Sequence, residues 1–326
     1  MKTIKEKAAK VTVLMPAYNA GKFIAEAIES VLQQTFTDFE LVIIDDGSTD
    51  NTAEIIQSFS DRRIHLIHQS HNGIAAALNK GLGIVESEYI ARFDADDICF
   101  PDRLMQQVSF LDENQDYIIT GSDAEYISED GEHLFYFRCI GHTHDEIIEK
   151  INSYCPFIHS AVMYRKNAVI KASGYSIHAH NFEDYLLWTQ ILKFGKFANL
   201  PQELIRVRFN PASVTIDERW RGRFFRKLKR DIISKGAITE KEGSHLLSII
   251  KSQDFQNIKE GAYYALCGKK FLLDNHQRKK ARPLFSKAIC RYPYRLDNYI
   301  LFLLSFFPGF FINWLHQMKT NKIFDS

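Results

Sequence analysis

Short apolar runs alternate with amphipathic segments over roughly the first hundred residues. Four runs rich in β-branched residues predict strands at residues 11–15, 41–44, 64–67 and 89–93. Apolar side chains recur at helical spacing over residues 23–32, and further helices are predicted at 52–59, at 74–85 and from Pro101 onward. This alternation predicts an α/β fold with a mostly parallel, Rossmann-like sheet and helices on both faces.

The pattern changes after about residue 116. Alternating residues at 117–137 flank an acidic turn and predict a hairpin, and an amphipathic helix is predicted to begin near Glu183. After Ser213 the chain becomes helical and basic, without a Gly-rich linker. We therefore expect a packed helical appendage at the C-terminal end.

Composition narrows the class of protein. The chain has 326 residues, 45% hydrophobic and 25% charged, which is enough for one large domain and an appendage. A net charge of +1 does not call for nucleic acid as a partner. Five cysteines without a C-x-x-C pair favour a reducing, cytoplasmic location. The first apolar run is too short for a signal peptide, and the stretch at 300–315 falls short of the ~20 residues that span a bilayer.

Polar residues follow the predicted strands, at the edge where open parallel sheets bind ligands. The first strand is followed by Pro16, Tyr18 and Asn19, the second by the sequence DDGS at 45–48, and the fourth by DADD at 94–97. Since these strand ends meet at one edge, we expect the three segments to line a single crevice.

Three carboxylates within four residues repel one another unless a cation neutralises them. Asp94, Asp96 and Asp97 form such a group, and their oxygen ligands suit Mn²⁺ or Mg²⁺ bound together with a diphosphate. The alternative is that these aspartates cap the helix at Pro101, and for Asp97 alone we favour it.

Tyr18 and Asp46 suit a pyrimidine base. The ring of Tyr18 offers a stacking face, and the carboxylate of Asp46 can accept a hydrogen bond from a base imide N–H. Taken alone, residues 45–48 are equally consistent with an acidic turn before a helix.

Together these residues resemble family 2 glycosyltransferases of the GT-A fold. The resemblance covers about residues 11–215 and rests on VTVLMPAYNAGKFIAEAIESVLQQTFTDFELVIIDDGSTDNT, NGIAAALNKGL, EYIARFDADD followed by PDRL, and EDYLLWTQI. It implies a GT-A domain over residues 1–215, with a donor half at 11–115 and an acceptor half at 116–215, followed by a helical region at 216–326.

The resemblance also assigns residues. It implies that the metal is held by Asp96 with Asp94, in a DxD motif, and that the donor is bound by Pro16, Tyr18, Asn19, Asp46, Asn72, Gly73, Asn79, Asp94, Ala95, Asp96 and Arg208. The acidic pair Glu183 and Asp184 would be catalytic, with Asp184 as the base, although two acids at a helix start also favour the helix dipole.

Three positions need comment. Many relatives carry Arg where this chain has Leu78, so a donor contact is missing or supplied elsewhere. Relatives often carry Arg-x-His where Arg208 is followed by Phe209 and Asn210, which leaves no imidazole ligand for the metal there. His159 either lines the acceptor pocket or is a structural histidine.

Two basic, aromatic segments raise the question of a membrane. Residues 219–230 hold seven Lys and Arg interleaved with aromatic residues, and an apolar stretch at 294–315 follows Arg291. Such segments bind an anionic membrane surface, or they pack on the protein with their charges in water.

We therefore predict an inverting, metal-dependent transfer of a hexose or N-acetylhexosamine from a UDP-sugar to a saccharide or lipid-linked acceptor. The predicted setting is polysaccharide or lipopolysaccharide biosynthesis in the cytoplasm, peripheral at the inner face of the cell membrane. The alternatives are a sugar nucleotidyltransferase, which would need a Gly-rich loop after the first strand, and a non-catalytic nucleotide-sugar-binding protein.

Overall fold

A computed structural model describes residues 8–209, 222–252 and 255–309. The chain forms two compact units. The first comprises residues 8–125, 136–207 and 227–246, and the second comprises 126–135, 208–209, 222–226, 247–252 and 255–309. The boundary predicted after residue 215 lies outside the described residues, and the division into domains stays a prediction.

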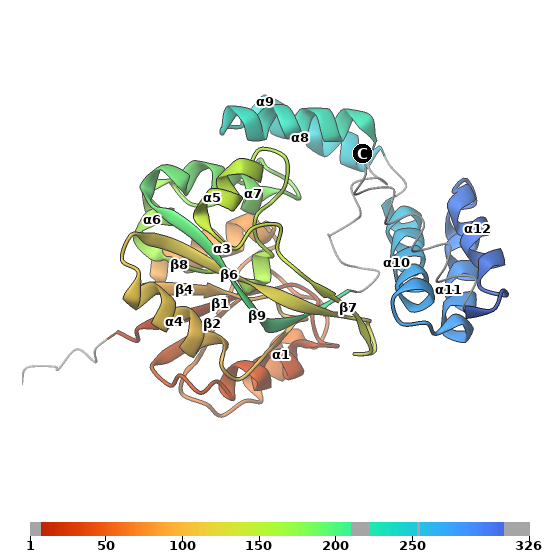
Figure 1. The fold of residues 1–326 in the computed structure, drawn as a ribbon. Helices are drawn as coiled ribbons and strands as arrows, with labels where there is room; N and C mark the ends of the chain where they lie inside the picture. The colour runs from red at the N-terminus through yellow and green to blue at the C-terminus, as the bar shows by residue number, and fades with distance from the viewer. Residues whose placement is uncertain (1–7, 210–221, 253–254, 310–326) are drawn as a thin grey trace, which may run out of the picture. The chain divides into compact units, whose positions relative to one another are not determined.

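A nine-stranded sheet, in the order β3-β2-β1-β4-β8-β6-β9-β5 with β7 paired to β6, organises the fold. Helices lie on both of its faces (Figure 1). The strands are β1 (Val11–Ala17), β2 (Phe39–Asp45), β3 (Ile64–His68), β4 (Tyr89–Arg92), β5 (Ile98–Cys99), β6 (Tyr117–Ile127), β7 (His133–Phe137), β8 (Met163–Arg165) and β9 (Lys196–Arg208).

The predicted βαβ region is parallel. β1 pairs in parallel with β2 and β4, and β2 pairs in parallel with β3. These strands are nearly continuous apolar runs because both faces are covered, and side chains such as Leu14, Ile43 and Ile90 are fully buried. The carboxyl ends of β1, β2 and β4 therefore meet at one edge.

The second half of the sheet is mixed. β8 pairs antiparallel with both β4 and β6, and β5 pairs antiparallel with β9. The predicted hairpin is present as β6 and β7, with Gly131 at φ +81° in its turn. The α/β fold class is confirmed, with antiparallel pairs in the second half of the sheet.

Helices connect these strands. The helices of the sheet region are α1 (Ile24–Leu32), α2 (Thr52–Gln57), α3 (Ile74–Ile84), α4 (Arg103–Glu113), α5 (His144–Lys150), α6 (Lys166–Lys171) and α7 (Glu183–Ile191), with short 3₁₀ turns η1 (His159–Ala161) and η2 (Leu192–Phe194). The helix expected from Pro101 begins at Arg103, and β5 separates it from the aspartates. The alternative that these aspartates cap that helix is therefore wrong.

The C-terminal region is helical, as expected. It holds α8 (Arg223–Lys235), α9 (Glu240–Lys251), α10 (Phe255–Leu273), α11 (Arg278–Arg291) and α12 (Leu296–Leu304). In the described part of the basic segment, Phe225 is buried and Phe224 is 65% exposed, so membrane binding and packing on the protein both stay open as predictions. Residues 219–221 of that segment lie outside the described residues, as do residues 310–315.

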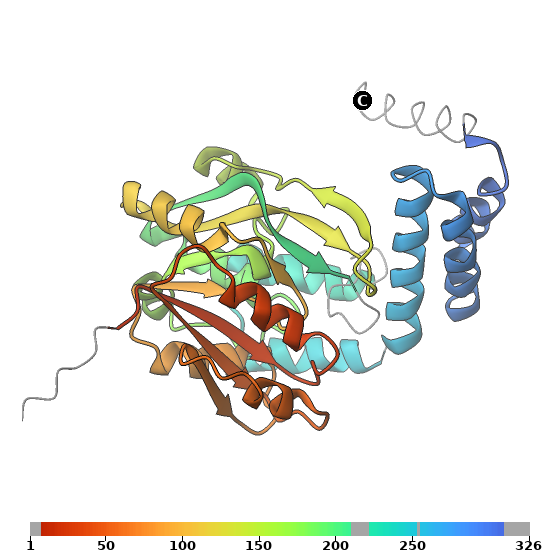
Figure 2. The same ribbon diagram turned by 90° about the horizontal axis from the view of Figure 1, so that it is seen from below.

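The second unit has its own core. In both ribbon views α10 and α11 lie side by side (Figures 1 and 2). Leu134 from the hairpin packs with Phe209, with Tyr263, Cys267, Phe271 and Leu272 of α10, and with Ala281 and Phe285 of α11. This cluster gives the hairpin tip and the C-terminal helices a common apolar interior.

No helix among the described residues is long and apolar enough to cross a membrane.

Candidate active site

The segments after β1 and β2 are joined by hydrogen bonds. Asn19 takes a left-handed conformation at φ 48°, which asparagine tolerates better than most residues. Its N–H donates to Oγ of Ser48 at 3.0 Å, and its Oδ1 accepts from the N–H of Thr49 at 2.8 Å. Pro16 lies within β1, opposite Ile44 of β2. The segments after β1 and β2 are therefore held together, and we call them, with the turn after β4, the rim of the sheet.

Asp46 organises the loop before α3. Its Oδ1 accepts hydrogen bonds from Nε2 of Gln69 at 2.6 Å and from the N–H of Asn72 at 2.9 Å. Its Oδ2 accepts from the N–H of Gly73 at 2.8 Å and lies 3.0 Å from Nδ1 of His71. The carboxylate is thus occupied within the protein, and a base imide would have to replace Gln69 or His71.

Tyr18 provides an exposed aromatic face beside this loop. Its side chain is 47% exposed and its ring stacks on His71, with ring centroids 4.1 Å apart and planes 25° apart. Gly47, at φ +76°, admits no Cβ because one would lie 2.9 Å from the backbone nitrogen of His71. The close approach of these loops holds the Tyr18–His71 pair in place.

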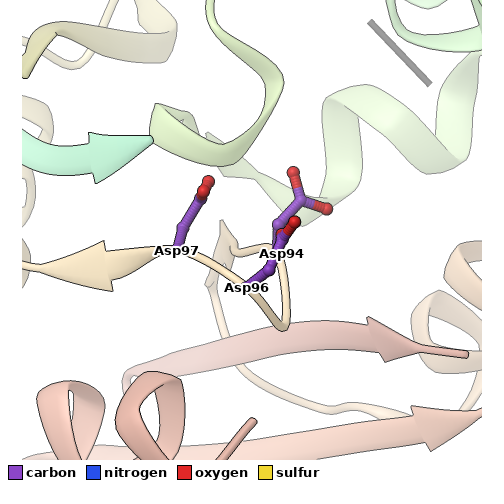
Figure 3. A group of neighbouring side chains, drawn as sticks. All are labelled: Asp94, Asp96 and Asp97. Carbon is purple, nitrogen blue, oxygen red and sulfur yellow. The ribbon is translucent and has the colours of Figure 1, made fainter. Parts of the chain in front are cut away.

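Asp94, Asp96 and Asp97 lie on the turn between β4 and β5. One carboxylate oxygen of each lies within 4.8 Å of the others, and the three side chains project to the same side of the turn (Figure 3). Hard oxygen donors this close together fit Mg²⁺ or Mn²⁺, and Asp97, which the sequence did not favour, belongs to the group. Ala95 between them is buried.

Arg92, at the end of β4, forms an ion pair with this turn. It is 1% exposed, its Nη1 forms an ion pair with Oδ2 of Asp94, and Nε has no hydrogen-bond partner among the described residues. Asp94 is also held through its N–H, which donates to Oγ of Ser160 at 3.0 Å. A buried guanidinium needs nearby negative charge, and the aspartate turn supplies it.

Glu183 and Asp184 begin α7, as predicted. Glu183 is 8% exposed, and burial raises its pKa to about 7, with the negative charge of Asp184 adding to the shift. Burial also raises the pKa of Asp184, while Arg92 and Lys229 oppose that rise. The thiol of Cys155 lies 3.8 Å from Oδ2 of Asp184. Lys229 and Arg92 thus partly offset the effect of burial on the pKa of Asp184.

Lys229 of α8 lies close to this acidic pair. Its Nζ lies 5.9 Å from the ring centroid of Phe182 and 5.3 Å from that of Tyr185, the residues on either side of the pair. Within the same unit, Nε2 of Gln190 donates to the carbonyl of Gly236 at 3.1 Å, which ties α7 to the end of α8. The helical region thus supplies a cation next to the proposed base.

Two predicted ligand-binding residues have partners within the protein. Oδ1 of Asn79 accepts from the N–H of Tyr175 at 2.8 Å, and Nδ2 of Asn79 donates to the carbonyl of Tyr175 at 2.7 Å. His159 lies 3.2 Å from the hydroxyl of Tyr175, and burial, with Arg92, holds the pKa of His159 well below its usual range. Both side chains support Tyr175, so the structural reading of His159 gains support while its acceptor role stays a prediction.

Arg208 and Leu78 complete the sequence-based set. Arg208 belongs to the second unit, where its Nη1 donates to the carbonyl of Glu129 at 3.0 Å, and its contact with a donor phosphate stays a prediction. Leu78 is fully buried in α3, so this position offers no donor contact.

Sequence reasoning missed Arg92 and Lys229. Arg92 interrupts an otherwise apolar strand, YIARF, and a charge in a buried strand is a signal of a paired or functional group. Lys229 gave no such signal, because seven cations share its segment and only the fold brings one of them to α7.

The first unit therefore combines two acidic centres around one buried cation. Arg92 pairs with Asp94 in the aspartate group, and its charge also acts on Glu183 and Asp184. One centre suits a metal ion with a diphosphate, and the other suits proton abstraction from a hydroxyl group.

Comparison with known proteins gives a consistent picture. The model of glycosyl transferase family 2 matches residues 12–173. The putative glycosyltransferase EpsE of Bacillus subtilis is 34% identical over 206 residues, which cover 61% of this chain and 73% of that protein. The amylovoran biosynthesis glycosyltransferase AmsE of Erwinia amylovora is 29% identical over 64% of this chain and 80% of its own length.

Not all relatives have this chain's length. An uncharacterized glycosyltransferase of Rickettsia bellii is 32% identical over 64% of this chain, but the match covers only 30% of that protein.

Solved structures agree in fold. S. aureus TarS 1–349 in complex with UDP-GlcNAc has a TM-score of 0.56 and 16% identity, covering 90% of this chain and 91% of that one. The mannosyltransferase PcManGT from Pyrobaculum calidifontis, in complex with GDP-Man and Mn²⁺, has a TM-score of 0.52 and 16% identity. The match covers 95% of this chain and 88% of that one.

Proposed function

We propose a specific reaction for this chain, which belongs to glycosyl transferase family 2. It is an inverting, metal-dependent transfer of a hexose or N-acetylhexosamine from a UDP-sugar to a saccharide or lipid-linked acceptor. The observation that carries the proposal is that Arg92 acts on two groups of carboxylates. It forms an ion pair with Asp94 of the aspartate group, and its positive charge lowers the pKa of Asp184.

The donor side is the rim formed after β1, β2 and β4. The exposed ring of Tyr18 stacks on the base, and Asp46 positions the loop at Asn72 and Gly73 beneath the nucleotide. Uridine as the base is supported by the likeness to TarS, which was solved with UDP-GlcNAc. The likeness to a mannosyltransferase solved with GDP-Man makes guanosine the base to test beside it.

A divalent cation, Mn²⁺ or Mg²⁺, is held by Asp96 with Asp94 and Asp97. The close approach of their oxygens fits such an ion, and PcManGT was solved with Mn²⁺. When bound, the ion supplies Lewis-acid stabilisation of the departing diphosphate. Arg92 holds Asp94 in position through its ion pair.

Asp184 is the general base. In an inverting transfer the acceptor hydroxyl attacks the anomeric carbon, the bond between that carbon and the diphosphate oxygen breaks, and a carboxylate takes the hydroxyl proton. Asp184 suits this role because Lys229 and Arg92 favour its ionised form. Glu183 beside it, with a pKa of about 7, is the group that carries a proton near neutral pH.

The acceptor is a glycan of the cell surface, free or linked to a lipid, bound by residues 116–215 near His159. This assignment is supported by the similarity to an amylovoran biosynthesis glycosyltransferase. The reaction takes place in the cytoplasm at the inner face of the membrane, with the helical region at 216–326 as the part that attaches the enzyme there.

A donor screen tests the proposal. The purified chain is incubated with UDP- and GDP-sugars and Mn²⁺ or Mg²⁺, and release of nucleoside diphosphate is compared between wild type and Asp96→Ala. We expect release from a UDP-sugar that the substitution abolishes. Release of pyrophosphate from a nucleoside triphosphate and a sugar phosphate would instead identify a nucleotidyltransferase, and full activity of Asp96→Ala would refute the metal site.

A further inference from the structure

One face of α12 is apolar yet exposed. Leu296 is 75% exposed, Ile300 58%, Leu303 62% and, two residues after the helix, Phe306 55%. With Tyr299 these residues follow the spacing i, i+3, i+4, i+7 and i+10, which aligns them along one side of a helix. We call these five residues the α12 stripe.

The opposite face of α12 fixes the direction of the stripe. Asn298 and Ser305 are buried, and Leu301 and Phe302 pack against the apolar cluster of the second unit. The helix therefore cannot rotate to hide the stripe without exposing that packed face. A contiguous exposed apolar surface of this kind marks an interaction site.

Cations stand at both ends of the stripe. The guanidinium of Arg282 lies 4.3 Å from the ring centroid of Phe306, and Arg278 donates to the carbonyl of Phe307 just beyond it. Arg295 directly precedes Leu296 at the other end and forms an ion pair with Asp297. Residues 278–304 hold seven Lys and Arg but only one acidic residue, Asp297.

We propose that the α12 stripe binds an anionic lipid surface, with the helix lying parallel to the membrane plane. The nine residues of α12 span only ~13 Å, about half the thickness of the hydrocarbon layer, so the helix lies in the interface. Its aliphatic and aromatic side chains enter the boundary between headgroups and acyl chains, and the flanking arginines meet lipid phosphates.

Charge favours a lipid surface over a second copy of the chain. Lys280, Arg291 and Arg295 are paired with Glu132, Glu260 and Asp297, whereas Arg278 and Arg282 donate to uncharged backbone carbonyls at the Phe306 end of the stripe. A symmetric dimer through this stripe would add these two arginines of both copies to one interface, which is unfavourable, whereas anionic headgroups neutralise them. The following residues continue the composition, since 310–324 hold Phe310, Phe311 and Trp314 together with Lys319 and Lys322 and no acidic residue. The inference deepens the proposed location but does not rest on the transfer reaction.

Vesicle sedimentation of the full chain tests the inference. Vesicles of phosphatidylcholine alone are compared with vesicles that also contain phosphatidylglycerol, at low and at high salt. The test variant is Ile300→Glu with Leu303→Glu. The matched control is Ile84→Glu with Ile170→Glu, which adds the same charge at two exposed isoleucine positions of the first unit.

We expect the wild type and the control to bind the anionic vesicles, to bind neutral vesicles more weakly, and to lose affinity at high salt. The stripe variant should lose at least about tenfold in partitioning while it keeps the thermal unfolding midpoint of the control. Equal binding by the stripe variant, or no binding of the wild type to anionic vesicles at low salt, would overturn the proposal.

Two further outcomes also count against it. Equal binding of the wild type to neutral and anionic vesicles would refute the role of the cations. A wild-type dimer that the stripe variant dissociates, without a change in vesicle binding, would show that the stripe is a self-association surface. If the stripe variant does not fold, a wild type that fails to bind anionic vesicles, or binds them no better than neutral ones, still refutes the proposal.

Discussion

The buried Glu183 carboxyl makes the stability of this protein depend on pH. Its pKa is about 7 in the folded chain, against an ordinary value of 4.5 that we take for the unfolded chain. Burial and the neighbouring charge of Asp184 disfavour ionisation in the folded chain. Between these values the unfolded chain releases the proton and the folded chain retains it. The free energy of unfolding therefore falls as pH rises from about 4.5 to 7 and then levels off.

The size of the effect follows from the shift. At 1.36 kcal/mol per pKa unit, the shift from 4.5 to about 7 costs about 3 kcal/mol once Glu183 is ionised, and most of this falls between pH 5 and 8. Glu183→Gln removes the ionisation but keeps the size of the side chain. The variant should therefore gain about 2–3 kcal/mol on the wild type between pH 5 and 8.

Urea unfolding at about pH 5 and pH 8 measures this difference, with tryptophan fluorescence reporting on Trp188, which is buried in α7. Asp116→Asn is the matched control, because Asp116 is a surface carboxylate paired with Lys196 and far along the chain from the acidic pair. If the stability difference between Glu183→Gln and wild type is the same at both pH values, Glu183 does not titrate as described.

Three further predictions concern single positions. Gly121→Ala should lower the free energy of unfolding in urea by about 1–3 kcal/mol, because the new Cβ would lie 2.2 Å from Oδ1 of Asn199. Asn199 cannot easily move away, since its Nδ2 donates to the carbonyls of Gly141 and Pro156. An unchanged unfolding midpoint would contradict this. Lys229→Met should raise the pKa of Asp184 and so move the acid limb of the kcat/KM profile to higher pH, whereas Lys229→Arg should leave the limb at its wild-type position. An acid limb that does not move in Lys229→Met would exclude electrostatic support of Asp184 by α8. Tyr18→Ala should weaken UDP binding by about tenfold in calorimetry while Tyr18→Phe keeps it, and equal losses in both variants would argue against ring stacking.

Much of the first unit was predictable because local patterns there agree with the final structure. Strands β1 to β4 lie at the four predicted positions, residues 11–15, 41–44, 64–67 and 89–93. The prediction succeeds because strands that are buried on both faces must be apolar, while the loops between them are polar. The carboxyl ends of parallel strands share one edge, so the polar segments at 94–97 and 16–19 had to lie near each other. The hairpin and the start of α7 at Glu183 followed from equally local signals.

The errors arose where distant parts of the chain decide the outcome. β5 exists because Ile98 and Cys99 pair with Arg206 and Ile205, a contact that local pattern does not reveal, and it displaces the start of α4 to Arg103. The amide of Asn79 is likewise hydrogen-bonded to the backbone of Tyr175, 96 residues away, and its donor-side role stays a prediction. Side-chain roles set by such long-range partners cannot be predicted from spacing.

The central claim is that one set of carboxylates serves the donor and another serves the acceptor. Asp184→Asn tests it most directly when UDP binding, followed by calorimetry with Mn²⁺, and sugar transfer, followed by nucleotide release, are measured on the same preparation. The account predicts that UDP affinity stays within about twofold while transfer falls by about 10²–10⁴-fold. Transfer at the wild-type rate, or a loss of UDP binding as large as the loss of transfer, would contradict it.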